Sequence, residues 1–216
     1  MGKNPSQVYR RDFFASFVDG AAKSASVVVP LVMSLFPIDS VLDVGCGPGA
    51  WAAEFLAQGV SDVWGIDGDY VNRSHLRIPA ERFLTRDLRE PLHLDRTFEL
   101  AVCLEVAERL PESRARGLVS DLTSLAPCIL FSAAVPRQGG AGHINEQYLP
   151  YWVTLFRRQG YQGVDPVRPR ILGNASVEWW YRQNTVMFAA RGHSLLADGF
   201  PEPQSFIHPN LYEDLY

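Results

Sequence analysis

The sequence predicts a single α/β domain, built on a mostly parallel β-sheet with helices on both faces. Short β-type runs alternate with helical runs over about 150 residues, the order expected of parallel strands joined by crossover helices. The run CILFSAAV at 128–135 is apolar throughout, which is typical of a strand buried on both faces. With 216 residues, 47% of them hydrophobic and 20% charged, the chain can form one sizeable core and is short for two.

Each element follows from its own apolar pattern. The first 38 residues are expected to form two helical pieces, because QVYRRDFFASFVD and AAKSASVVVPLVMSLF place apolar residues three and four apart. Gly59 and Gly160 are expected to end two of the later helices. Strands are predicted at 40–46, 62–67, 82–88, 99–106, 128–135, 161–167 and 185–191, and helices at 50–59, 112–126 and 146–160, with a short irregular helix at 71–76.

Composition excludes several classes of protein. The net charge is −4 and no block of Lys and Arg occurs, which argues against a nucleic-acid partner. Cys46, Cys103 and Cys128 lie in apolar runs without metal-site spacing, so we expect buried thiols in a reducing compartment. The apolar stretch 25–38 contains two prolines and is too short to span a bilayer. A cytoplasmic protein without a signal peptide or membrane contact is expected.

The stretch LDVGCGPGAW places three glycines between a strand and a helix. Such a turn exposes backbone N–H groups at a helix N-terminus and suits a polar or anionic ligand. Gly45, Gly47, Gly49 and Ala50 also satisfy the dinucleotide-binding pattern, so an NAD-dependent oxidoreductase on a Rossmann-like fold is one interpretation.

Three acids near strand ends favour a different cofactor. Asp43 precedes the glycines, where a carboxylate would repel a pyrophosphate and suit an ammonium group. Asp67 ends the second strand, where a carboxylate can bind a ribose diol. Asp87 ends the third predicted strand, where it can accept a hydrogen bond from an exocyclic amine, and the backbone N–H of Leu88 can donate to a ring nitrogen. Amine, diol and adenine together describe S-adenosylmethionine.

The ordered segments VLDVGCGPG, GID, RDL and FELAVCLEV, over roughly residues 38–135, resemble the class I S-adenosylmethionine-dependent methyltransferases. The resemblance implies a Rossmann-like sheet of seven strands with the last one antiparallel, and S-adenosyl-L-methionine as cofactor. It implies that the glycine turn holds the methionine moiety and that the later acids hold ribose and adenine. The predicted cofactor-binding residues are Asp43, Gly45, Cys46, Gly47, Gly49, Trp51, Asp67, Gly68, Asp87, Leu88 and Leu104.

The methyl acceptor is expected at the loops that follow two later strands, because ligands of open α/β sheets bind outside the carboxyl ends of the strands. His143 has an ordinary pKa suited to taking a hydroxyl proton, and we assign it and Glu105 to catalysis. Asn145 also fits a helix N-cap and Glu146 a first helical turn, so structural roles stay open for this loop. The predicted substrate-binding residues are Glu108, Arg109, Asn145, Gln147, Trp180 and Tyr181.

EVAERLPE is similar to the E-x-x-E-H-L-P segment of ubiquinone-type O-methyltransferases and small-RNA 2′-O-methyltransferases, whose glutamates and histidines hold a divalent metal. Arg109 stands at the histidine position, and a cationic side chain cannot ligate a cation. No metal is therefore predicted.

The leading hypothesis is O-methylation of a small hydroxylated metabolite, such as a sugar or natural-product intermediate. The alternatives are the NAD-dependent oxidoreductase, a non-catalytic subunit that keeps the cofactor fold, and an RNA 2′-O-methyltransferase, against which the acidic charge argues. One domain over 1–216 is expected, with a helical cap at 1–38, a cofactor-binding half at 39–135, a substrate-side half at 136–192 and a tail at 193–216. A small-molecule acceptor is the expected partner, and a homodimer is compatible with the sequence.

Overall fold

The computed structural model describes residues 11–213, and its centre is one sheet of seven strands. The strand order is β3-β2-β1-β4-β5-β7-β6, and β7 runs antiparallel to both of its neighbours while the remaining pairs are parallel. This confirms the predicted seven-stranded sheet with an antiparallel last strand. The strands are β1 (Ser40–Val44), β2 (Asp62–Asp67), β3 (Phe83–Thr85), β4 (Leu100–Leu104), β5 (Cys128–Ser132), β6 (Tyr161–Val164) and β7 (Val186–Ala190).

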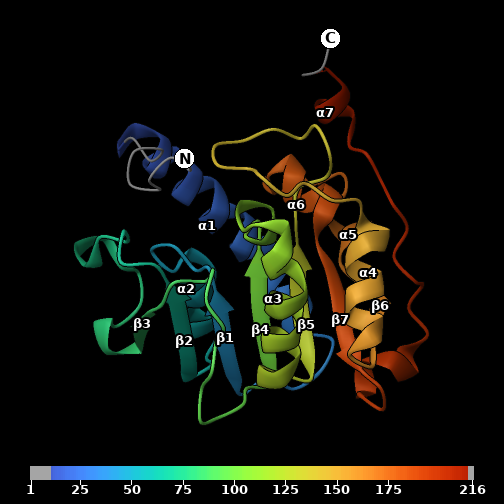
Figure 1. Ribbon diagram of the computed structural model, residues 1–216, viewed down its shortest axis with the longest axis horizontal. Helices are drawn as coiled ribbons and strands as arrows, with labels where there is room; N and C mark the ends of the chain where they lie inside the picture. The colour runs from blue at the N-terminus through green and yellow to red at the C-terminus, as the bar shows by residue number, and fades with distance from the viewer. Residues whose placement is uncertain (1–10, 214–216) are drawn as a thin grey trace.

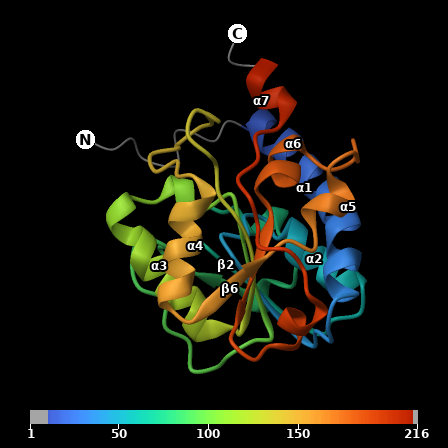
Figure 2. The ribbon, with the colours of Figure 1, turned by 90° about the vertical axis from the view of Figure 1, so that its right-hand side faces the viewer.

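Helices cover both faces of this sheet (Figures 1 and 2). One face carries α1, α2, α5 and α6, and the other carries α3 and α4; each face has its own cluster of buried apolar side chains. The α-helices are α1 (Arg11–Met33), α2 (Ala50–Ala57), α3 (Glu112–Leu125), α4 (Leu149–Arg158), α5 (Arg168–Ile171), α6 (Trp179–Asn184) and α7 (Pro209–Glu213), and the short 3-10 helices are η2 (Arg73–His75), η3 (Ala80–Arg82), η4 (Ala107–Arg109) and η5 (Ser194–Asp198).

The N-terminal region differs from the two helical pieces that we predicted. Within the described residues α1 is one continuous helix through Gly20, and residues 7–10 of the first predicted piece lie outside the described part. A Cβ at Gly20 would lie 2.3 Å from Oε1 of Glu178, so the glycine permits a close approach to α6 rather than a break. Ser24 supports this contact, because its hydroxyl accepts a hydrogen bond from the Glu178 N–H at 3.0 Å.

The boundaries of two predicted elements matter for the site. The strand predicted at 82–88 ends at Thr85, so Asp87 and Leu88 lie in the loop that follows it. The helix predicted at 146–160 begins at Leu149, with Tyr148 as its N-cap residue. Asn145 and Glu146 therefore lie in a loop and not in a helix N-terminus, and their side chains make hydrogen bonds within and beside that loop.

The described part of the C-terminal segment packs back on the body. Pro201 accepts a hydrogen bond from Asp165 N at 3.0 Å, and the N–H of His208 donates to Oε1 of Gln183 at 2.7 Å. His208 is only 6% exposed, so this histidine of the C-terminal segment is buried against the body. All three cysteines are buried and free, as predicted.

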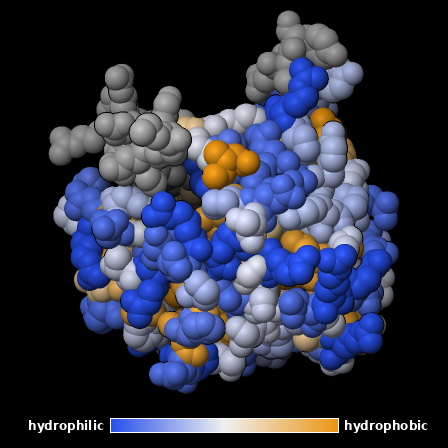
Figure 3. Space-filling model, viewed as in Figure 1, coloured by the Kyte–Doolittle hydropathy of each residue, from blue (hydrophilic) through white to orange (hydrophobic). Residues whose placement is uncertain are grey.

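The carboxyl ends of the parallel strands meet at one edge, at the top of Figure 1, where the loop between β5 and α4 arches over them. The strand order reverses between β1 and β4, and open α/β sheets bind ligands at such a point. The molecular face in Figure 3 is mainly hydrophilic, with hydrophobic residues in small separate spots. Among the described residues, no helix combines the length and the apolar character needed to cross a bilayer.

Candidate active site

The glycine turn after β1 has three residues with left-handed backbone, and they serve different purposes. The φ angles of Gly45, Gly47 and Gly49 are 79°, 54° and 88°. A Cβ at Gly45 would lie 2.3 Å from Cγ2 of Val106, so this glycine lets the turn approach the end of β4. A Cβ at Gly49 would lie 3.2 Å from Ile78, whereas at Gly47 it would meet nothing within 4 Å. Close packing therefore explains why Gly45 and Gly49 have no side chain. Gly47 has no such neighbour, and its backbone lies beside open space.

Asp43 lies in β1 just before this turn and is 3% exposed. Its Oδ2 accepts a hydrogen bond from Ala52 N at 3.2 Å, and it makes no ion pair within the described residues. Burial raises the pKa of Asp43 to about 7, and the nearby charge of Asp67 also raises it. A buried carboxylate without a cationic partner is costly, so the site favours a ligand that carries a positive charge.

Asp67 ends β2 and joins the glycine turn directly. Its Oδ2 accepts from Gly47 N at 2.6 Å, and its Oδ1 accepts from Gly68 N at 2.7 Å and from the hydroxyl of Tyr70. Burial raises the pKa of this carboxyl, although the three hydrogen bonds oppose that shift. The structure thus brings Asp67, Gly47 and Gly68 together, and their role in binding a cofactor stays a prediction.

Asp87 is placed differently from the other two acids. Its carboxylate pairs with Arg89, whose Nη2 lies 2.6 Å from Oδ2, and the side chain is 45% exposed. The hydrogen bonds from Arg89 lower the pKa of Asp87. The side chain of Leu88 is buried, and its carbonyl accepts from Nε of Arg114 at 2.9 Å. The carboxylate of Asp87 is thus paired with Arg89 and partly exposed, and its adenine role stays a prediction.

Buried apolar and aromatic side chains lie next to the glycine turn, in the sequence or in the fold. Trp51 and Tyr181 are buried with ring centroids 5.0 Å apart, and Nε1 of Trp51 lies 3.5 Å from the Tyr181 hydroxyl. The Trp180 ring packs against Tyr181 at 5.9 Å. Cys46 and Leu104 are also buried, and a Cβ at Gly65 would lie 2.7 Å from the Cys46 sulfur. Trp51, Tyr181, Cys46 and Leu104 therefore belong to one cluster of buried side chains on this face of the sheet.

Glu105 follows β4 and holds an unusual backbone, with φ 57° in a residue that is not glycine. Ser132 fixes this conformation by accepting from Glu105 N through its carbonyl at 3.1 Å and its hydroxyl at 3.0 Å. The carboxylate accepts from Nδ2 of Asn184 at 3.1 Å and Nε2 of Gln138 at 3.0 Å. Burial raises its pKa despite these donors. Strained, well-supported residues of this kind cluster at functional sites.

Three amide side chains around Glu105 were missed by the sequence interpretation. Gln183 donates to Oε1 of Gln138 at 3.1 Å and to Oδ1 of Asn184 at 3.0 Å, and it accepts from His208 N. The network joins the loop after β5, helix α6 and the C-terminal segment. Only a glutamine in a glycine-rich loop and an asparagine just before β7 hint at it in the sequence, and amides are common in both places.

Glu108 and Arg109 lie in η4, next to Glu105. Glu108 is fully buried, and neither of its carboxyl oxygens has a hydrogen-bond partner among the described residues. Burial, and then the charge of Glu105, raise the pKa of Glu108 well above its usual range and favour its protonated form. Arg109 donates from Nη1 to Ala141 O at 2.5 Å and from Nε to Glu105 O at 3.1 Å, so it ties the loop after β5 to the end of β4.

His143 is held between two carboxyl groups. Its Nδ1 lies 3.0 Å from Oε1 of Glu146, and its Nε2 lies 3.7 Å from Oε1 of Glu108. Glu146 also accepts from the N–H groups of Arg137 and Gly139 at 2.8 Å each. Burial lowers the pKa of His143, so the ring is neutral at pH 7, with Nδ1–H donated to Glu146 and a lone pair on Nε2.

Asn145 and Gln147 serve the loop itself in this structure. Asn145 is 4% exposed; its N–H donates to Glu108 O at 3.0 Å, and its Nδ2 donates to Ala107 O at 3.4 Å. Gln147 donates from Nε2 to Oδ1 of Asn145 at 3.1 Å. They hold the loop that carries His143 against η4, and their contact with substrate stays a prediction.

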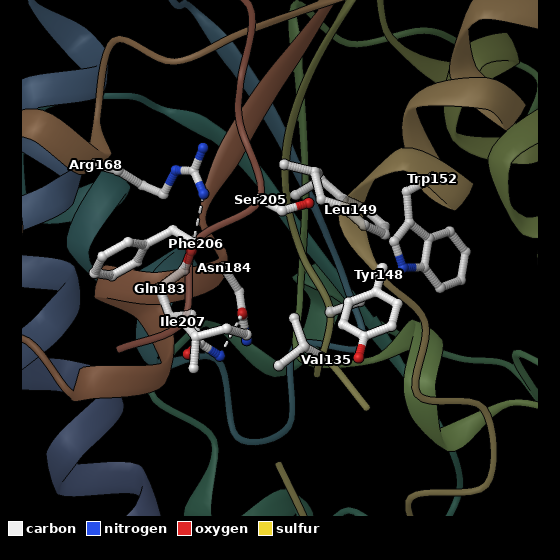
Figure 4. Close-up of a pocket in the computed structure, with 12 residues that line it drawn as sticks. Val135, Tyr148, Leu149, Trp152, Arg168, Gln183, Asn184, Ser205, Phe206 and Ile207 are labelled. Carbon is white, nitrogen blue, oxygen red and sulfur yellow. Dashed lines mark hydrogen bonds between the residues drawn. The ribbon is translucent and has the colours of Figure 1, made fainter. Parts of the chain in front are cut away.

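A small pocket lies beside the amide network (Figure 4). Its cavity of about 20 Å³ has room for little more than one water molecule. Phe131, Val135 and Trp152 give it apolar walls, and Gln183 and Asn184 line it on another side. In the part of the chain that is described, no group of three or more His, Cys, Asp and Glu residues could hold a metal ion.

Comparison with known families gives one match. A family model described as a methyltransferase domain matches residues 11–129, more than half of the chain. This segment contains the glycine turn, Asp67 and the end of β4. No match was found among curated protein sequences.

Solved structures share the fold. Magnesium protoporphyrin IX methyltransferase from Synechocystis PCC 6803 with bound SAM is 22% identical, with a TM-score of 0.58, and the match covers 79% of this chain and 80% of that one. CalS10 of Micromonospora echinaspora, an amino pentose methyltransferase involved in calicheamicin biosynthesis, is 16% identical with a TM-score of 0.63. The match covers 88% of this chain and 99% of that one. Streptomyces venezuelae DesVI is 15% identical with a TM-score of 0.63, and the match covers 88% of this chain and 100% of that one.

Proposed function

The chain belongs to the family of methyltransferase domains, and on that premise we propose that it transfers a methyl group from S-adenosylmethionine to a hydroxyl of a small molecule. The observation that carries the hydroxyl assignment is the neutral His143, oriented by Glu146 in the loop between β5 and α4. A sugar or natural-product intermediate is the proposed acceptor class, because CalS10 methylates an amino pentose within a biosynthetic route.

The residues at the turn fit S-adenosylmethionine. Gly47 leaves space beside its backbone, and Asp43 is a buried carboxylate suited to an ammonium group. Asp67 is placed to accept hydrogen bonds from ribose hydroxyls, next to the same turn. When bound, the cofactor supplies an electrophilic methyl group. A nicotinamide cofactor would instead place a pyrophosphate beside Asp43, which is electrostatically unfavourable.

The acceptor hydroxyl becomes acidic as its oxygen gains the methyl group, and it needs a base at that moment. Nε2 of His143 takes the proton, and Glu146 stabilises the resulting imidazolium through Nδ1. Glu105 and its amide partners Gln138 and Asn184 join the end of β4 to the loop that carries His143 and to the end of α6. Most of the rate enhancement then comes from positioning the two reactants.

We expect His143→Ala to lower turnover by about 100-fold, at the lower end of what a general base contributes. Affinity for S-adenosylhomocysteine should stay within about twofold, because no bond links His143 to the residues of the glycine turn. Transfer of the labelled methyl group to a panel of hydroxylated sugars and their amino counterparts would be measured. The exposed His93 provides the control variant His93→Ala, which should keep full turnover.

The pH profile gives an independent check of the same proposal. The pKa of His143 is lowered by burial, so kcat/KM should decline on the acid side only below about pH 6.5, the ordinary value. Unchanged turnover in His143→Ala would remove His143 from the mechanism. Transfer to amino sugars alone would place the acceptor atom on nitrogen instead of oxygen.

A further inference from the structure

The Asp67 carboxylate already has most of its hydrogen-bonding capacity filled by the chain itself. Oδ1 accepts from Gly68 N and from the Tyr70 hydroxyl, and Oδ2 accepts from Gly47 N. A carboxylate has about four lone-pair positions, two on each oxygen. Within the described residues three of them are taken, which leaves one free position on Oδ2.

A ribose diol requires two of these positions. One hydroxyl can donate to the free lone pair on Oδ2, and the second must replace a donor that is present on the carboxylate. The N–H groups of Gly47 and Gly68 belong to the backbone of the turn and of the end of β2, so they cannot leave without rebuilding the site. Tyr70 reaches Asp67 only through its side chain, which can change rotamer.

The position of the Tyr70 ring supports such an exchange. Tyr70 is 42% exposed, so a large part of this residue is in contact with solvent. Its Cε1 lies 2.2 Å from where a Cβ at Gly68 would stand, so the ring lies directly over this glycine. Gly68 is therefore needed for the phenol to reach Asp67. A side chain at position 68 would exclude the ring from this carboxylate.

We propose that the Tyr70 hydroxyl occupies the position of a cofactor ribose hydroxyl on Asp67, and that the cofactor must displace it to bind. This inference rests on the proposed function, because it takes Asp67 as the ribose ligand. Tyr70 stabilises the empty site and lowers the affinity for S-adenosylmethionine and S-adenosylhomocysteine alike. The same phenol returns to Asp67 as the product departs, and it thereby favours product release.

The test uses Tyr70→Phe, which keeps the ring and removes the hydroxyl. We expect its affinity for S-adenosylhomocysteine, measured by calorimetry, to rise about three- to tenfold, since the ligand then displaces water instead of a hydrogen bond to a charged group. For the 2′,3′-dideoxy analogue of the same ligand, which has no hydroxyl to place on Asp67, the affinity should change by less than twofold. Tyr212→Phe, at an exposed tyrosine of α7, is the matched control.

Weaker or unchanged binding of S-adenosylhomocysteine by Tyr70→Phe would refute the proposal that the ligand displaces the Tyr70 hydroxyl. The phenol would then assist binding or have no effect on it. An equal gain for the dideoxy analogue would also overturn it. Failure of the unmodified protein to bind S-adenosylhomocysteine would refute the proposed function, and it is a separate result. Thermal unfolding of each variant without ligand checks that the fold is retained.

Discussion

Replacing Asp43 by asparagine should make the protein without cofactor more stable above pH 7, and at the same time much poorer at binding S-adenosylhomocysteine. The carboxyl is 3% exposed and its pKa is raised to about 7, so the folded state disfavours the charged form. Asparagine has nearly the same shape and can still accept the hydrogen bond from Ala52 N. The substitution therefore removes a buried charge and keeps the local packing.

The sign and the pH window follow from the raised pKa. The unfolded chain loses this proton near pH 3.8 and the folded chain near pH 7, so the unprotonated carboxyl destabilises the fold increasingly between these values. The full difference is on the order of 4 kcal/mol above pH 7. Asp43→Asn should recover about 2–4 kcal/mol at pH 8 and clearly less at pH 5.

Binding should change in the opposite direction. A charged hydrogen-bonding partner is worth about 1.5–3 kcal/mol, so the loss of the carboxylate should weaken S-adenosylhomocysteine binding by roughly 10- to 100-fold at pH 8. Urea unfolding at both pH values and calorimetric titration measure the two effects. The exposed Asp95 offers the control Asp95→Asn, which should shift stability by no more than about 0.5 kcal/mol. If Asp43→Asn is less stable than the parent protein at pH 8, the charged carboxylate of Asp43 does not destabilise the fold, and the prediction is wrong.

Two alanine substitutions in the glycine turn should separate folding from binding. Gly45→Ala places its Cβ 2.3 Å from Cγ2 of Val106, in a backbone with φ 79°. The clash and the left-handed strain together should cost about 3–5 kcal/mol, a large part of the stability of an ordinary domain. The protein should unfold at a much lower temperature, and it should show little cofactor binding.

Gly47→Ala should behave differently, although it lies two residues away in the same turn. Its Cβ meets nothing within 4 Å, so only the strain at φ 54° remains, at about 1–2 kcal/mol. The methyl group would stand in the space we assign to the cofactor, and overpacking there should weaken binding by about 100-fold. Circular-dichroism melting and titration with S-adenosylhomocysteine compare the pair. Normal affinity in Gly47→Ala would move the cofactor away from this face of the turn.

Local patterns in the sequence were sufficient for much of the fold. The strand at 62–67 was predicted with the boundaries that the structure shows, because its apolar residues are bounded by turn residues at both ends. The N-terminal helix was divided wrongly, since the reason Gly20 lies inside it is Glu178, more than 150 residues away. The start of α4 was also placed too early, because Glu146 accepts hydrogen bonds from Arg137 and Gly139 instead of beginning a helix.

The sequence by itself determined the seven strands in their chain order, the glycine turn and the two acids next to it, Asp43 and Asp67. These follow from periodicity and from residue types within short segments, which one chain displays directly. Only the tertiary structure decided the partners of the polar side chains. It placed Asp87 on Arg89, Glu105 between Gln138 and Asn184, His143 on Glu146 and Tyr70 on Asp67. The partners of Glu105 lie far away in the chain, and only the packing of the loop after β5 and of α6 against the end of β4 brings them within about 3 Å. Asp87, His143 and Tyr70 bind groups two or three residues away, but several polar groups lie that near in the sequence, and the folded backbone selects which of them comes within reach.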